Sequence, residues 1–114
     1  MSFVVVSAIS GDVFARHEVS DAQVATAFFE GLQKASQNSK GRVGIAIIMD
    51  ESGPVAFGRA YGNMVIIEAT TAGAAKLQEA VNGAQGKTDT VSDFVRFAIT
   101  NLSVNDGFKN TRFA

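Results

Sequence analysis

The segment from Val43 to Met49 contains only apolar residues and glycine, and it constrains the fold more than any other feature of the chain. A strand with this composition is covered on both faces and lies in the interior of its sheet. The rest of the chain must therefore provide neighbouring strands as well as cover for two faces. How it does so depends on the order of the other segments.

Apolar periodicity and turn residues predict the remaining elements. Ser20 to Gln23 has the capping-box pattern, and the apolar residues that follow have helical spacing, so a first helix is expected up to Ala35. Thr70 or Thr71 is expected to cap a second helix that ends near Ala84. Strands are expected over 3–9, 43–49, 55–57, 64–69 and 94–102, whereas residues 13–18 fit either a short strand or an ordered loop.

These elements form a repeat in which strand, helix and strand (3–49) are followed by strand, helix and strand (64–102). A helix between two strands is the usual crossover between parallel neighbours. We therefore expect a single α+β domain over residues 1–114, with two β-α-β repeats forming a four-stranded mixed sheet and two helices on one face. The opposite face would be apolar and bare, so other copies of the chain are expected to cover it.

Composition restricts the possible functions. Only 18% of residues are charged, where globular proteins average about 25%, which also favours self-association. Ten basic and eleven acidic residues are spread without runs, which argues against a nucleic-acid partner. With no cysteine and one histidine, neither disulfides nor a metal or other cofactor are expected. No stretch suits a signal peptide or a membrane span, so a cytoplasmic protein is predicted.

Several segments resemble the tautomerase superfamily, in particular the subgroup of macrophage migration inhibitory factor. Gly107 to Ala114 resembles the GWNNSTFA ending of that subgroup, and Ser92 to Ile99 resembles its strand SPDRVYINYY. Val55 to Gly58 matches its MAFG, and Thr71-Ala72-Gly73 falls where SIG opens its second helix. The resemblance implies a homotrimer whose sheets form a barrel, with enol–keto tautomerisation of small keto acids such as phenylpyruvate.

In that family the catalytic group is an N-terminal proline, and Ser2 takes its place here once Met1 is removed. A primary amine at Ser2 could act as a base or form an imine with a carbonyl, but less well oriented, so weak or absent activity is expected. By the same resemblance Lys40 and Arg96 are candidates for binding a substrate carboxylate, and Phe108 could line the substrate pocket. Each also fits a plainer role: a loop lysine, a surface arginine and a packing aromatic. His17 has no catalytic partner pattern and is expected to be a loop residue.

Two other functions remain open. The trimer could be a binding module without enzymatic activity. Alternatively, if residues 13–18 form a strand, the order β-β-α-β-β-β-α-α resembles longin or roadblock domains, which bind small GTPases. That resemblance implies a monomer or a dimer instead of a trimer.

Overall fold

The structure is a computed structural model, and it describes residues 2–38 and 40–107, without the side chain of Ser2. The described chain is an α+β protein with three helices and six strands. In order, the elements are β1 (Ser2–Ile9), β2 (Asp12–Ser20), α1 (Val24–Asn38), β3 (Gly44–Asp50), β4 (Gly53–Tyr61), β5 (Met64–Ala69), α2 (Thr71–Gly83), α3 (Thr90–Ile99) and β6 (Leu102–Val104).

The strands form one mixed sheet in the order β2-β1-β3-β4-β5-β6. Neighbouring strands are antiparallel except β5 and β6, which are parallel. Within the described chain β2 and β6 are the two edges, so the sheet is open and does not close into a barrel. The segment predicted as the interior strand is β3, at the centre of the sheet.

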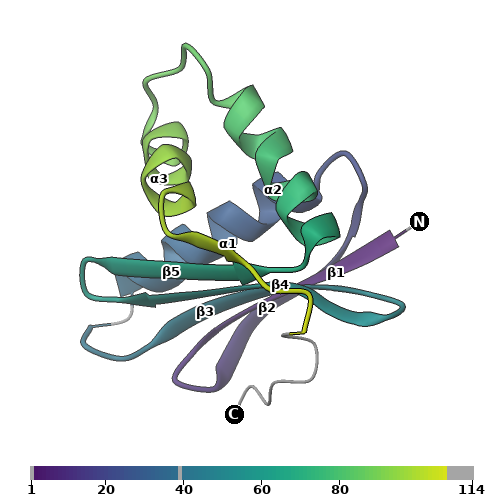
Figure 1. Ribbon diagram of the computed structural model, residues 1–114. Helices are drawn as coiled ribbons and strands as arrows, with labels where there is room; N and C mark the ends of the chain where they lie inside the picture. Colours follow the sequence, from purple (N-terminus) through teal and green to yellow (C-terminus); the bar gives the residue numbers. More distant parts are fainter. Residues whose placement is uncertain (1, 39, 108–114) are drawn as a thin grey trace.

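All three helices lie on one face of this sheet (Figure 1). Helix α1 packs across β1, β3 and β4, while α2 and α3 pack against α1 and over β4 and β5. Small residues allow this close approach. A Cβ added to Gly58 of β4 would lie 2.8 Å from a methyl carbon of Leu32, and one added to Gly31 of α1 would lie 2.1 Å from the Ser7 hydroxyl oxygen. Phe28, Leu32 and Ala35, on the same face of α1, are fully buried.

Strands 3–9 and 43–49 were predicted to be parallel, and this is wrong because a hairpin intervenes. Ser10 and Gly11 both have positive φ, 50° and 85°, as a two-residue type I′ turn requires. The ambiguous segment 13–18 therefore belongs to a strand, β2, which pairs antiparallel with β1. Since β1 is antiparallel to both β2 and β3, these two run in the same direction, and α1 is the crossover between them.

The strand predicted over 94–102 is a helix for most of its length. Asp89 caps α3 by accepting from the Ser92 amide at 2.9 Å, and the buried residues Ser92, Val95 and Ala98 follow at helical spacing. Only Leu102 to Val104 is extended, as β6. The segment compared above with a tautomerase strand is thus helical. The sheet has six strands and not the predicted four, and the described chain has three helices and not two.

Other predictions are confirmed. β5 has the predicted bounds, and Thr70 caps α2 by accepting from the Gly73 amide at 3.0 Å. The first helix is present, but it begins at Val24, later than the capping box predicted, and the Gln23 amide donates to the Ser20 backbone carbonyl and not to the predicted hydroxyl. Among the described residues, no helix combines the length and apolar composition that a bilayer span requires.

Candidate functional site

We call the face opposite the helices the outer face. Residues paired across a sheet point to the same side, so the strand registers define it. Val6 of β1, Ile47 of β3 and Phe57 of β4 are paired in one row of this face, and none belongs to the core cluster beneath the helices. The other apolar members are Val4, Ala8, Val13, Ile45, Met49, Tyr61, Met64 and Ile66.

Burial across the outer face falls from its centre to its margin. Val6, Ala8 and Phe57 are buried, and Ile45, Ile47 and Met49 are half-buried. At the margin, Val13 is 59% exposed, Tyr61 57% and Met64 62%. No helix of the described chain packs on this face, so the margin of a largely apolar surface remains in contact with solvent. The exposed apolar residues at this margin are candidates for an interaction site.

Charged side chains occur at both ends of the central row. Arg16 of β2 pairs with Val6, and Glu68 of β5 pairs with Phe57. The row therefore reads Arg16, Val6, Ile47, Phe57 and Glu68, with β3 at its midpoint. Arg16 is exposed and Glu68 half-buried, and Glu68 accepts a hydrogen bond from the Asn105 amide at 2.9 Å. Such a row can bind an apolar partner that carries charges at matching positions.

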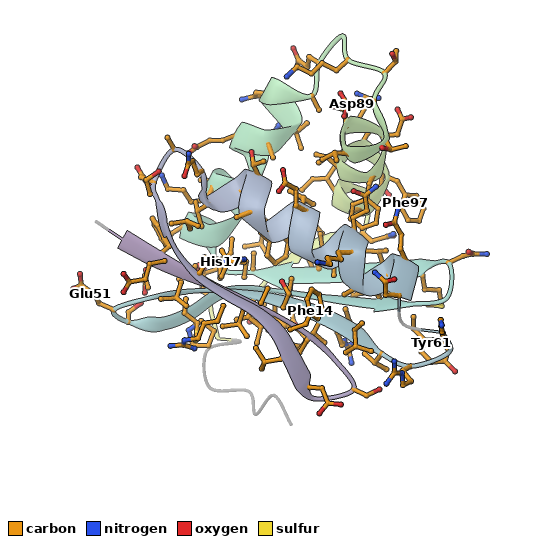
Figure 2. The ribbon with its side chains drawn as sticks, turned by 180° about the vertical axis from the view of Figure 1, so that it is seen from behind. Phe14, His17, Glu51, Tyr61, Asp89 and Phe97 are labelled. Carbon is orange, nitrogen blue, oxygen red and sulfur yellow. The ribbon has the colours of Figure 1, made fainter. Side chains whose placement is uncertain are left out.

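The structure separates two of the residues predicted to form an active site. β1 begins at Ser2, and Val4 pairs with Met49, so Ser2 lies at the Glu51 end of the sheet. Lys40 precedes β3 at the opposite end, where Gly44 pairs with Ala60. Figure 2 shows Glu51 and Tyr61, which mark these two ends. The two positions are thus roughly 20 Å or more apart within one chain, the length of β1 at about 3.3 Å per residue.

Arg96 is occupied within the helical layer. Its guanidinium donates to the Ala84 carbonyl at 2.7 Å and to the Lys87 carbonyl at 2.9 Å, and it forms an ion pair with Asp93. These bonds tie the segment between α2 and α3 to α3 itself. Arg96 thus holds the backbone between α2 and α3 in place. It is remote from Ser2, because α3 packs over β5 whereas Ser2 begins β1.

Two predictions remain, for Phe108 and for His17. Phe108 lies outside the described residues. His17 is exposed on the edge strand β2, where Figure 2 shows it on the same strand as Phe14. It is therefore a strand residue and not the loop residue that was predicted. Within the described part of the chain, no group of three or more histidine and acidic side chains could hold a metal ion.

A hollow of about 370 Å³ lies between α1, α2 and α3. Phe29 and Val95 contribute apolar surface to it, and Glu30, Glu79 and Asp89 contribute carboxylates. Two of these carboxylates have structural partners: Asp89 accepts from Ser92, and Glu79 accepts from Lys76. The hydrogen bonds from the Ser92 amide and hydroxyl hold the pKa of Asp89 below its ordinary value, so it is ionised near neutral pH.

The sequence predicted the apolar outer face but not the charges that frame it. Arg16 was missed because residues 13–18 were not assigned to a strand, and Glu68 because the sequence did not predict which strands are neighbours. The turn residues Ser10-Gly11 directly before this segment are the signal that could have assigned it to a strand.

Comparisons with known proteins leave the family of this chain open. Searches of protein-family models, of curated proteins and of solved structures gave no match to it.

Proposed function

We propose that this chain is a self-associating interaction module without enzymatic activity, and that a second copy covers its outer face. The observation that carries the proposal is the division of the sheet into one face closed by three helices and one apolar face on which no described helix packs. Burial of apolar surface stabilises an association by about 25 cal/mol per Å² before its entropic costs. The margin residues Val13, Met64 and Ile66 are the ones that gain most contact.

The arrangement of the candidate catalytic groups supports the same proposal. Ser2 and Lys40 stand at opposite ends of one sheet, and the donors of Arg96 are used on backbone carbonyls. A tautomerase needs a base and an anion-binding cation around one substrate carbon. Within one chain these three residues do not provide that constellation.

Substitution of Ile47 by Asp tests the association. An aspartate at the midpoint of the outer face places a charge where a partner would bury it, so the variant should be monomeric at concentrations where the natural chain is associated. Glu51→Asp at the β3–β4 turn is the matched control, and it should leave the mass unchanged. Mass is measured by light scattering after size exclusion. Equal masses for Ile47→Asp and the natural chain would contradict the proposal, provided that circular dichroism shows both folded.

A tautomerase remains the second candidate, because β1 begins at Ser2 and so pins the predicted catalytic position into the sheet, as the resemblance implies. Assembly of three copies would then have to bring Lys40 or Arg96 from a neighbour to that position. The test is phenylpyruvate tautomerisation by the natural chain and by the Ser2→Pro variant, with Ser2→Ala as control. A gain confined to Ser2→Pro supports the enzyme, and no turnover by any of them removes it.

The observed order of elements favours a third candidate, a longin- or roadblock-like partner of small GTPases. The chain has the order β-β-α-β-β-β-α-α, followed by β6. Titration calorimetry with purified small GTPases, each loaded with GDP or with a non-hydrolysable GTP analogue, tests it. Nucleotide-dependent heat would support it, and flat titrations with every protein would count against it.

A further inference from the structure

From the edge strand β2 we infer a second contact between copies of this chain: residues 15–19 of two chains pair antiparallel about a two-fold axis that is perpendicular to the sheet and passes between the two copies of His17. The inference goes beyond the proposed function, because it uses an edge of the sheet and does not depend on what covers the outer face. It names Arg16 and Glu18 as the residues that select the register.

One side of β2 has no strand beside it. Within the described residues β1 is the only strand that pairs with β2, so alternate backbone amides and carbonyls of β2 point away from the sheet. Such an edge is a template for pairing with another chain. A bulge at Phe14, which has no partner in the β1 register, interrupts β2, and regular pairing extends from Ala15 to Ser20. The regular part of the edge is therefore centred near His17.

The charges on this edge have opposite signs. Arg16 and Glu18 are two residues apart on β2, so both point to the outer side of the sheet. Both are exposed, and in the part of the chain that the structure describes no ion pair engages either of them. A two-fold axis at His17 places Arg16 of each chain directly opposite Glu18 of the other. The contact thus gains two equivalent ion pairs.

Neighbouring registers lack this match. Residues paired across a sheet point to the same side, so a two-fold axis of this kind must pass through a residue position. An axis at Arg16 or at Glu18 places that residue opposite its own copy, and like charges directly opposite each other destabilise a strand pair. An axis at Ala15 pairs Arg16 with the bulge, and one at Val19 pairs it with a residue beyond the end of β2. Charge therefore selects the axis at His17.

The helix side of the edge is compatible with the same axis. His17 and Val19 pair with the core residues Val5 and Phe3 of β1, so they point to the helix side, as does Ala15. Pairing brings Ala15 of one chain opposite Val19 of the other, and the small alanine leaves room for the valine. Both are half-buried in the single chain, so the contact extends the apolar layer of β1 outward. His17 faces its own copy.

This contact is expected to be weaker than association through the outer face. Five residues of strand span about 17 Å. A contact of that length along one edge falls short of the roughly 1,000 Å² that stable interfaces exceed. It should therefore leave the mass of the chain unchanged at micromolar concentrations and join chains at millimolar concentrations or where copies are held together. Covalent capture can detect such a contact.

Cysteine capture tests the axis, since the chain has no cysteine of its own. In His17→Cys the thiol faces its own copy with Cβ atoms roughly 5 Å apart, so a short bismaleimide should link two chains. Asp12→Cys is the matched control, because it is exposed on the same strand. Its two copies would be roughly 30 Å apart, and they should link about tenfold more slowly or less. Both variants carry Ile47→Asp, so that the outer face does not bring the cysteines together.

A charge-reversal cycle in the same background tests the register. Arg16→Glu and Glu18→Arg each place two pairs of like charges in contact, so each should slow linking through position 17 roughly fivefold or more. The double variant exchanges the partners and should link within about twofold of the starting rate. Lys87→Glu, an equal change of charge on the exposed segment between α2 and α3, should leave the rate unchanged. Each rate is divided by the rate with N-ethylmaleimide, which corrects for thiol reactivity.

A measurement on the natural chain needs no substitution at the edge. The backbone amide NMR signals of residues 15–19 should shift as the protein concentration rises into the millimolar range, whereas those of α2 and α3 should stay in place. Equal linking at positions 17 and 12, reversals that have no effect, a double variant that stays slow, or unchanged signals of β2 would each overturn the edge contact. The proposed function fails separately: if the natural chain is monomeric at micromolar concentrations, linking through position 17 should persist.

Discussion

The two faces of the sheet are built from the same strands but in different ways. On the inner face, Ala46, Ala56 and Gly58 are small, and this allows α1 to lie directly on the backbone. On the outer face, Ile47 and Phe57 are large, and charged residues frame them. The inner face thus has the composition of a surface closed by its own chain. The outer face has that of an interface, with an apolar centre and a polar rim.

Two adjacent isoleucines on β3, one on each face of the sheet, provide the strongest test of the difference between the faces. Ile48 is fully buried beneath the helices, and Ile47 is on the outer face. Ile48→Ala should lower the free energy of unfolding by about 2–5 kcal/mol at every protein concentration, because it leaves a cavity. Ile47→Ala should lower the free energy of unfolding by less in dilute solution. This loss should grow with protein concentration, because association adds to the stability of the natural chain.

Urea unfolding at two protein concentrations, at least a hundredfold apart, measures both effects. The same contrast is available on β5, where Ile67 is 0% exposed and Ile66 41% exposed. If the loss in free energy of unfolding is equal for the inner and outer isoleucine of each pair and independent of protein concentration, the two faces do not differ in the way described.

A pair of glycines in α2 tests the close approach of the helical layer. A Cβ at Gly73 would lie 2.0 Å from the Val55 carbonyl oxygen of β4, whereas one at Gly83 would meet nothing within 4 Å. Gly73→Ala should therefore lose about 1–3 kcal/mol by overpacking. Gly83→Ala should be neutral or gain up to about 1 kcal/mol, since alanine favours helix. Thermal unfolding compares them, and equal melting temperatures would contradict the packing described for α2.

The cap of α2 should contribute less than its packing. Thr70 accepts from the Gly73 amide and is itself buried. Thr70→Ala leaves that amide without its partner and should cost about 1 kcal/mol, while Thr70→Ser, which keeps the hydroxyl, should restore most of the loss. Chemical unfolding of the three chains is the measurement. A serine variant as unstable as the alanine variant would show that the methyl group, and not the cap, matters.

The smallest expected effect is a loss of stability at alkaline pH. The Lys76 ammonium pairs with Asp21 and Glu79, and the hydrogen bond with Asp21 raises the pKa of Lys76 above its ordinary value. Its contribution is complete below the unfolded-state pKa of about 10.4 and is lost as pH rises through the higher folded-state value. Melting temperatures between pH 9 and pH 11.5 should fall less for Lys76→Met than for the natural chain. If the melting temperatures of the two chains fall equally with pH, the ion pairs of Lys76 do not contribute to stability.

Local patterns predicted much of the fold, and non-local pairing limited the rest. Val43 to Met49 and Met64 to Ala69 were recognisable as strands because their composition alone defines them. The direction of pairing was missed because it depended on whether Ser10-Gly11 makes a hairpin. The helix over 90–99 was missed because residues 94–102 were assigned to a strand, although the apolar residues of this segment recur at helical spacing. Arg16 and Glu68 are far apart in sequence, and only the sheet register aligns them.

The mass of the natural chain in solution tests the central claim most directly. Sedimentation equilibrium over a wide concentration range should converge on twice the 12.0 kDa of one chain and fall toward a single chain on dilution. A mass that stays at one chain at every concentration would contradict the claim that a second copy covers the outer face.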